Sequence, residues 1–347
     1  MSVRSVLARS GIAMLAAGSL AVTACGRPAR TPDAEASRSA PAPRASARAW
    51  VTMLDRDHPL VGRIWSVRER RFVDERDMIG ALHAGPDGGR ALGVYVLLGE
   101  KHDNPDHHAL QAEVLRALVE RGAKPVVAFE MFDVEKQAAI DEARRTSPRD
   151  ATALARAVDW EHSGWPAWSH YAPIAQVALD ADLPIIAGGL SATKMRAMMR
   201  PPAEGAGPVL DEGVPLTPDQ RASLTEELRA SHCGHLPEAM LPVMIKMQRA
   251  RDAAMANALV TGVDRAHPSG VLIAGTGHTR TDRGVPLDLR ARDPGRPVWS
   301  IAFVEVERGK DDADAYAPRW NTTKLPFDFV WFTPRATDED PCAAFAH

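Results

Sequence analysis

Four short apolar runs, separated by longer segments with helical periodicity, constrain the fold of this chain more than any other feature. Each run has four or five residues, which suits a buried strand and is too short for a buried helix. They span residues 94–98, 125–129, 183–187 and 271–274. Buried strands that alternate with helices are typical of βαβ units. The sequence therefore predicts an α/β fold with a mostly parallel sheet flanked by helices.

Two further apolar runs, residues 298–306 and 327–332, are expected to complete this sheet, the second as an antiparallel edge strand. The segments 133–171 and 217–260 are long and helical in pattern. We expect them to form a helical lobe over the carboxyl ends of the strands. Polar side chains of the second segment share one helical face by their 3/4 spacing and can point toward the strand ends: Gln248, Arg251 and Asp252.

The helix after the first run has clear end signals. Asn104 can cap it, Pro105 suits its first turn, and Gly122 follows its last turn. His107 and His108 fall in the first turn, and we expect them on a solvated face of the helix start.

Residues 1–24 have the pattern of a signal peptide. Arg4 and Arg9 precede a largely apolar run at 11–22. This run is too short to span a bilayer, since spanning needs about 20 apolar residues. It leads into the sequence VTAC, which resembles the bacterial lipobox and ends at Cys25. The alternative is a buried helix that meets a cysteine by chance.

A tether is expected after the signal peptide. Residues 25–49 are mostly Ala, Pro, Arg and Ser and include no aromatic residue, so they cannot bury a core. We expect this disordered segment to link a lipidated Cys25 to a folded domain at 50–347. The expected location is the cell envelope, with the lipid anchor in the outer membrane.

The chain has three cysteines. If Cys25 carries lipid, Cys233 and Cys342 are the remaining pair in a chain exported to an oxidising compartment, and we predict a disulfide between them. Neither CxxC nor CxxCH occurs, which excludes a zinc ribbon and covalent c-type haem. The 42 Lys and Arg residues nearly balance 45 Asp and Glu, so no basic excess points to a nucleic-acid partner.

Carboxylates and imidazoles follow three of the predicted strands. They are Glu100, His102, Glu130 and His278. Because ligands of open α/β sheets bind outside the carboxyl ends of the strands, these side chains are candidates for one shared site. They could ligate a divalent metal or act as general acids and bases. The plainer alternative is that they cap helices or pair with arginines. No G-x-S-x-G motif supports a serine nucleophile.

Several segments resemble ChaN-type lipoproteins, the haem-binding uptake branch of the Tiki superfamily. They are LLGEKHDNPDHHALQAEVL at 97–115, VVAFEMF at 126–132, HLPEAM at 235–240, QRARDAAMA at 248–256, VLIAGTGHTRTDRGVPLDL at 271–289 and FVWFTPRATDEDPC at 329–342. The resemblance implies an α/β sheet with a helical lobe, a surface lipoprotein, and noncovalent haem binding linked to iron acquisition.

The resemblance also carries an enzymatic alternative. The wider superfamily includes erythromycin esterases and Tiki metalloproteases, and their functional positions match Glu100, His102, Glu130 and His278 here. A metal-dependent or His-dependent hydrolase is therefore the competing hypothesis. A third hypothesis is a surface lipoprotein whose site is vestigial and which only binds a partner protein.

Haem iron takes His, Tyr, Met or Cys ligands inside an apolar cleft. We expect Tyr171 or His235 as the axial ligand and Met240 and Met244 along the haem face. The alternative is that Tyr171 is a core aromatic residue and that the methionines fill a core. A haem-uptake receptor and a second copy of the chain are the expected protein partners.

We predict that Cys25→Ser releases the protein from membranes, because buried lipid contributes about 0.8 kcal/mol per CH₂ and no other segment can anchor the chain. Metabolic palmitate labelling followed by membrane fractionation measures this. Label that persists in the Cys25→Ser variant would contradict the prediction.

Overall fold

The computed structural model describes residues 48–84, 93–199, 210–340 and 342–343. The predicted signal peptide (1–24), Cys25 and the predicted tether up to residue 47 lie outside the described residues. The last two residues of that tether are described, and the Arg48 guanidinium donates to Glu113 Oε1 at 2.6 Å. In the part of the chain that the structure describes, no helix is long and apolar enough to cross a membrane.

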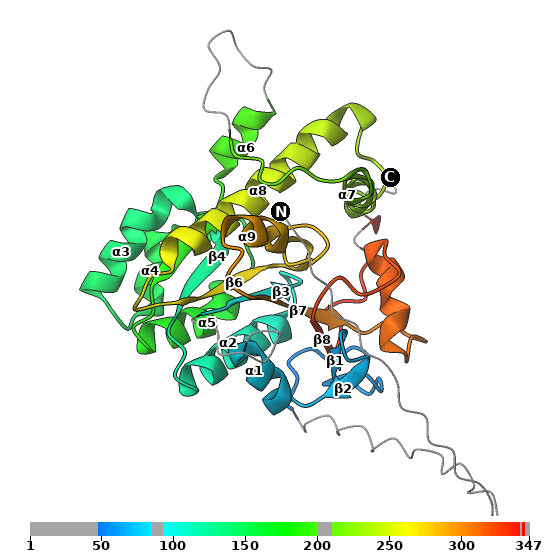
Figure 1. Ribbon diagram of the computed structural model, residues 1–347, viewed down its shortest axis with the longest axis horizontal. Coiled ribbons are helices and arrows are strands. Elements are labelled where there is room, and N and C mark those ends of the chain that lie inside the picture. The colour runs from blue at the N-terminus through cyan, green and yellow to red at the C-terminus, as the bar shows by residue number, and fades with distance from the viewer. Residues whose placement is uncertain (1–47, 85–92, 200–209, 341, 344–347) are drawn as a thin grey trace, which may run out of the picture. The chain divides into compact units, whose positions relative to one another are not determined.

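The described strands form one eight-stranded sheet in the order β2-β1-β8-β7-β3-β6-β4-β5 (Figure 1). Their bounds are β1 Ile64–Ser66, β2 Arg71–Val73, β3 Tyr95–Glu100, β4 Pro125–Asp133, β5 Ile185–Gly189, β6 Ser269–Gly275, β7 Val298–Glu305 and β8 Phe329–Thr333. The six strands from β8 to β5 are parallel, and β1 pairs antiparallel with both β8 and β2. The predicted α/β fold with a mostly parallel sheet is confirmed.

The direction and place of β8 correct one expectation. Phe329–Thr333 pairs in parallel with β7 and antiparallel with β1, so β8 is an interior strand and not an antiparallel edge. The reason is the long connection after β7. It contains the 3₁₀ helix η5 (Ala313–Trp320) and returns the chain toward the amino end of β7 before β8 begins.

Helices cover both faces of the sheet. Their bounds are α1 Glu75–His83, α2 Pro105–Glu120, α3 Gln137–Thr146, α4 Ala151–Ala157, α5 Trp168–Asp180, α6 Ala192–Met198, α7 Pro218–Ser231, α8 Leu241–Gly262 and α9 Val285–Arg292, with short 3₁₀ turns η1 Val134–Lys136, η2 Trp160–His162, η3 Glu238–Met240 and η4 Thr276–His278. Successive strand residues point to opposite faces. Val96 and Leu98 therefore pack with α1–α5, whereas Tyr95 and Leu97 pack with α8 and α9.

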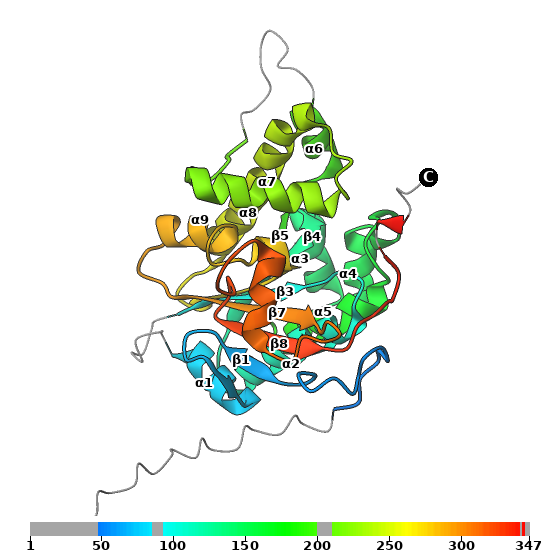
Figure 2. The same cartoon turned by 90° about the vertical axis from the view of Figure 1, so that its right-hand side faces the viewer.

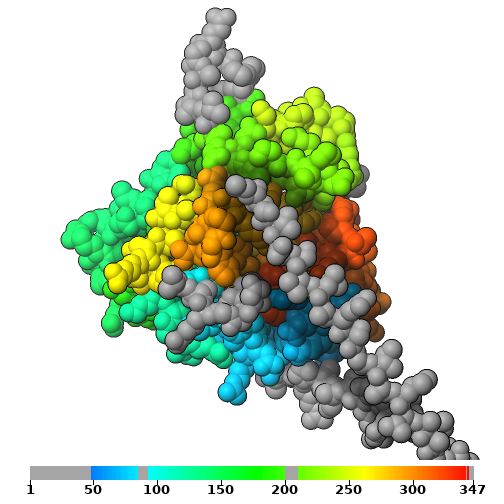
Figure 3. Space-filling model, in the orientation of Figure 1, coloured from blue at the N-terminus to red at the C-terminus, as the bar shows by residue number. Residues whose placement is uncertain are grey.

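A helical lobe stands beyond the sheet, built from α7 and the first half of α8 (Figures 2 and 3). These two helices share an apolar cluster of their own, which includes Leu224, Leu228, Leu241 and Ile245. The lobe therefore comes from the second of the two helical segments that the sequence indicates. The first segment, α3–α5, covers one face of the sheet instead.

The structure contains the disulfide between Cys233 and Cys342, whose Cα atoms are 5.5 Å apart. Cys233 follows α7 in the lobe, and Cys342 lies in the segment after β8. The bond therefore ties the C-terminal segment to the lobe.

We predict that Cys342→Ser lowers the melting temperature, because losing a native disulfide typically costs about 2–5 kcal/mol. Alkylation and mass measurement of the unreduced protein should find Cys233 blocked in the wild type and reactive in the variant. Two reactive thiols in unreduced wild-type protein would contradict the bond.

Candidate functional site

The parallel strands β3, β6 and β4 are neighbours, so their carboxyl ends meet at one edge of the sheet. Glu100 is the last residue of β3 and lies beside Gly275 of β6. The pairing of β4 with β6 ends at Phe129, and Glu130 comes next. His278 ends η4, directly after β6. The structure thus brings the four strand-end side chains together around an open cavity of about 510 Å³.

Glu100 is buried and has three partners. Its Oε1 accepts hydrogen bonds from the Tyr171 hydroxyl and from His102 Nδ1, both at 2.8 Å. His108 Nδ1 lies 3.0 Å from Oε2. Burial disfavours the charged form, but the nearby imidazoles of His108 and His102 outweigh it and hold the pKa of Glu100 well below its ordinary value. The carboxylate is therefore ionised at neutral pH.

His102 is the most accessible of the four side chains, with 34% of its side chain exposed. Its Nδ1 donates to Glu100, so the carboxylate fixes the ring and leaves Nε2 over Gly275. A Cβ at position 275 would lie only 2.8 Å from Nε2, so a side chain there would displace the ring from this position. Trp165 packs beside the ring at 4.8 Å between centroids.

The second half of the site centres on His278. Its Nδ1 donates to Asp252 Oδ1 at 2.6 Å, and its Nε2 lies 3.4 Å from Glu130 Oε1. Burial lowers the pKa of His278, but Glu130 and Asp252 outweigh this and raise it to about 9. Glu130 also accepts from the Gly275 amide at 2.6 Å and pairs with Arg251. At neutral pH His278 is therefore a cation between two carboxylates.

The pairing continues away from the cavity along α8. Arg249 donates to Asp252 Oδ2 at 3.0 Å and to Asp288 Oδ2 at 2.8 Å. The helical 3/4 spacing pointed to Arg251 and Asp252, and both do face the strand ends. The role of Arg249 carried no sequence signal, because it depends on a contact with α9.

His107 and His108 correct a second expectation. Both are fully buried rather than solvated. His107 Nδ1 accepts from the Lys101 amide at 2.9 Å, and His108 Nε2 donates to the His102 carbonyl at 3.0 Å. The first turn of α2 lies beneath the loop that carries His102, which shields both rings from water.

The predicted haem contacts lie apart from this cavity. Tyr171 is fully buried, and its hydroxyl donates to Glu100, so its use as an iron ligand would require the core to open. His235 is exposed on the loop before η3. Met240 is the last residue of η3, and Met244 packs against the lobe core. The roles of these four residues stay predictions, and this geometry gives them no support.

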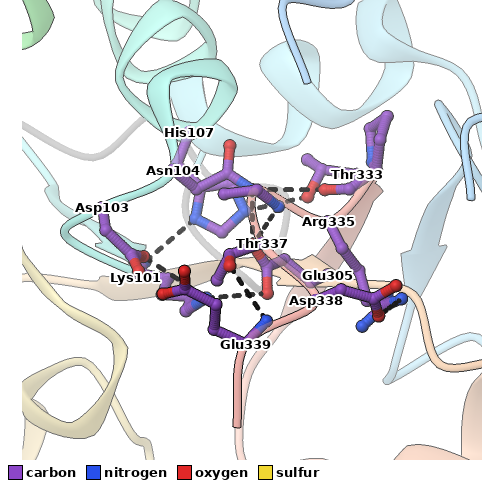
Figure 4. A network of polar contacts seen from close by, with 12 residues as sticks. Lys101, Asp103, Asn104, His107, Glu305, Thr333, Arg335, Thr337, Asp338 and Glu339 are labelled. Atoms are coloured by element: carbon purple, nitrogen blue, oxygen red, sulfur yellow. Dashed lines mark hydrogen bonds and ion pairs between the residues drawn. The ribbon is translucent and has the colours of Figure 1, made fainter. Parts of the chain in front are cut away.

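The walls of the cavity are aromatic and basic. Trp165 and Trp320 line it, together with Lys101, Arg251 and Arg319. Lys101 Nζ also lies 3.1 Å from the buried Glu305, which fixes the lysine at the rim (Figure 4). Within the described ranges, no group of three or more His, Cys, Asp or Glu side chains is arranged to hold a metal ion.

The His278–Asp252 pair predicts a pH-dependent contribution to stability. The pKa of His278 is about 9 in the folded protein and about 6.5 when unfolded. Its contribution is therefore complete below pH 6.5 and is lost as the pH rises through 9. Asp252→Asn should cost about 3–5 kcal/mol, because it breaks a buried pair, and should weaken this dependence, while the contribution of Glu130 remains.

Urea unfolding between pH 6 and pH 9.5 measures both effects. Asp264→Asn is the matched control, since Asp264 pairs with His267 at the surface. An unchanged pH dependence in Asp252→Asn would contradict the assignment.

Comparison with solved structures finds matching chains. The structure reported as "Cofacial heme binding to ChaN of Campylobacter jejuni" has 23% identity and a TM-score of 0.59, and the match covers 77% of this chain and 95% of that chain. A mutant of the erythromycin esterase EreC in its open conformation has 12% identity and a TM-score of 0.42, covering 72% and 92%. A comparison with curated protein sequences found no significant match.

A family model described as "Haem-binding uptake, Tiki superfamily, ChaN" matches residues 93–289. The matched segment includes the strands β3, β4 and β6 and all four strand-end side chains. It spans more than half of the chain, which therefore belongs to the ChaN family of haem-binding uptake proteins in the Tiki superfamily.

Proposed function

We propose that this protein binds haem noncovalently in the cavity at the carboxyl ends of β3, β4 and β6. The observation that carries this proposal is the chemistry of the cavity walls. Trp165 and Trp320 offer flat apolar surfaces, and Lys101, Arg251 and Arg319 are cationic side chains, each also paired with a carboxylate of the chain. A planar macrocycle with two carboxylates suits such a site. Membership of a haem-binding family and the haem-binding Campylobacter relative add support.

The donor set of the cavity fits haem iron through an imidazole. All three tyrosines of the chain are fully buried, and Cys233 and Cys342 are joined in a disulfide. His102 is accessible, and a carboxylate holds its Nδ1, as in many metal-binding histidines. We propose that His102 Nε2 would bind the haem iron. Haem would supply the iron centre there.

We also propose that the protein acts in haem uptake from a lipid-anchored position on the cell envelope. The lipobox-like sequence before Cys25 supports the anchor, and the Cys233–Cys342 bond suits an oxidising compartment. An open cavity leaves part of a bound haem uncovered. A haem-uptake receptor or a second copy of the chain would cover it.

Haemin titration followed by the Soret band tests the haem proposal. Wild-type protein should saturate at a simple ratio. His102→Ala should shift the Soret band and weaken binding at least about tenfold, because the residue that would hold the iron is lost. His267→Ala is the matched control, since that imidazole lies outside the cavity lining and pairs with Asp264. Absorbance that never saturates, or equal binding by both variants, would contradict the proposal.

A hydrolase is the second candidate, and the Glu100–His102 pair favours it. A carboxylate that orients an accessible imidazole is also the arrangement of a general base. In that case Glu100→Gln, His102→Ala and His278→Ala should each reduce ester or peptide hydrolysis by about 100-fold or more. Haem binding alone does not predict that these three variants lose hydrolytic activity together.

A further inference from the structure

Two consecutive histidines, His107 and His108, lie beneath the loop between β3 and α2, and neither lines the cavity. In this loop the Lys101 amide and the His102 carbonyl point down toward α2. The amide is a hydrogen-bond donor and the carbonyl is an acceptor. One imidazole must therefore accept a hydrogen bond from this loop, and the other must donate one.

His107 acts as the acceptor. Its Nδ1 accepts from the Lys101 amide at 2.9 Å, so its proton is on Nε2, which donates to Thr333 Oγ1 at 2.8 Å (Figure 4). The ring is neutral in this arrangement. Burial also lowers the pKa of His107 well below its ordinary value.

His108 acts as the donor. Its Nε2 donates to the His102 carbonyl at 3.0 Å, and its Nδ1 lies 3.0 Å from Glu100 Oε2. The other oxygen of Glu100 accepts from His102 Nδ1. His108 therefore holds the backbone of His102 directly and its ring through Glu100. The rings of His170 and Tyr171 pack against His108 from α5.

We propose that His107 and His108 are positioning residues that fix the Lys101–His102 segment and thereby set the direction of the His102 ring in the cavity. A plain core role does not require nitrogen atoms. Buried polar atoms carry a free-energy cost unless they are paired, and an apolar side chain of similar size would fill the space without that cost. The ring nitrogens that contact the Lys101 amide and the His102 carbonyl are the atoms that a positioning role requires.

Substitution by Asn or Gln allows a matched test. The side-chain amide of Asn lies near the Nδ1 position of histidine, and that of Gln lies near the Nε2 position. His107→Asn retains an acceptor for the Lys101 amide, whereas His107→Gln loses it. His108→Gln retains a donor to the His102 carbonyl, whereas His108→Asn loses it. Thr333→Val removes the other partner of His107 and leaves the loop contact intact.

Two measurements on protein without haem give the direct readout. Amide hydrogen exchange at Lys101 should be at least about fivefold faster in His107→Gln than in His107→Asn, because the hydrogen bond that protects this amide is lost. Diethyl pyrocarbonate should modify His102 faster in His108→Asn than in His108→Gln. Thr333→Val should behave like wild type in both measurements.

The protonation state of His107 can be tested in the wild-type protein, without any variant. In wild-type protein labelled with ¹⁵N-histidine, NMR should find His107 neutral with its proton on Nε2. A His107 cation, or a proton on Nδ1, would overturn the inference. Equal exchange and equal modification within each Asn/Gln pair of folded protein would also overturn it.

The relevance to ligand binding rests on the proposed function and is tested separately. Haemin affinity should fall about 10- to 100-fold in His107→Gln and His108→Asn, the usual effect of disturbing a group that orients a metal ligand. If exchange and modification change while haemin affinity does not, the histidines still position His102, and the proposal that His102 binds haem iron fails.

Discussion

The ionised carboxylate of Glu100 is the interaction on which the cavity depends. It lies at the end of a buried strand, where an unpaired charge would be strongly unfavourable. Its partners come from three places: His102 from the following loop, His108 from α2 and Tyr171 from α5. Satisfying one carboxylate therefore fixes two helices and a loop at the strand end. The direction of the His102 ring follows from that arrangement and from the absence of a side chain at Gly275.

Local patterns predicted the strands that are long and fully buried, and they missed what depends on distant segments. The runs at 94–98, 125–129, 183–187 and 271–274 lie within or overlap β3, β4, β5 and β6. β1 and β2 have three residues each, which is too few for any periodicity. The direction of β8 was predicted wrongly, because an apolar run indicates a strand and not its orientation. Orientation follows from the connection through η5.

The same limit applies to the site. Glu100, His102, Glu130 and His278 could be placed together from sequence, since the ends of parallel strands share one edge. The burial of His107 could not, because its partner Thr333 lies 226 residues away. Two adjacent histidines at a helix start have the pattern of a solvated turn. Tyr171 shows the same ambiguity, because the sequence does not reveal whether its hydroxyl meets a ligand or a carboxylate.

The cavity floor consists of paired charges within the sheet core, from Glu100 with its imidazoles to Glu130, His278 and Asp252. Such a floor needs little rearrangement when a ligand binds, which favours affinity. The lobe is held in a different way. Helix α7 shares an apolar cluster with α8, meets the loop after η4 through polar contacts such as Gln220 with the Asp282 carbonyl, and is tied by the Cys233–Cys342 disulfide to the C-terminal segment. Ion pairs therefore hold the floor, whereas the lobe depends on its own apolar cluster and on polar and covalent links to the rest of the chain.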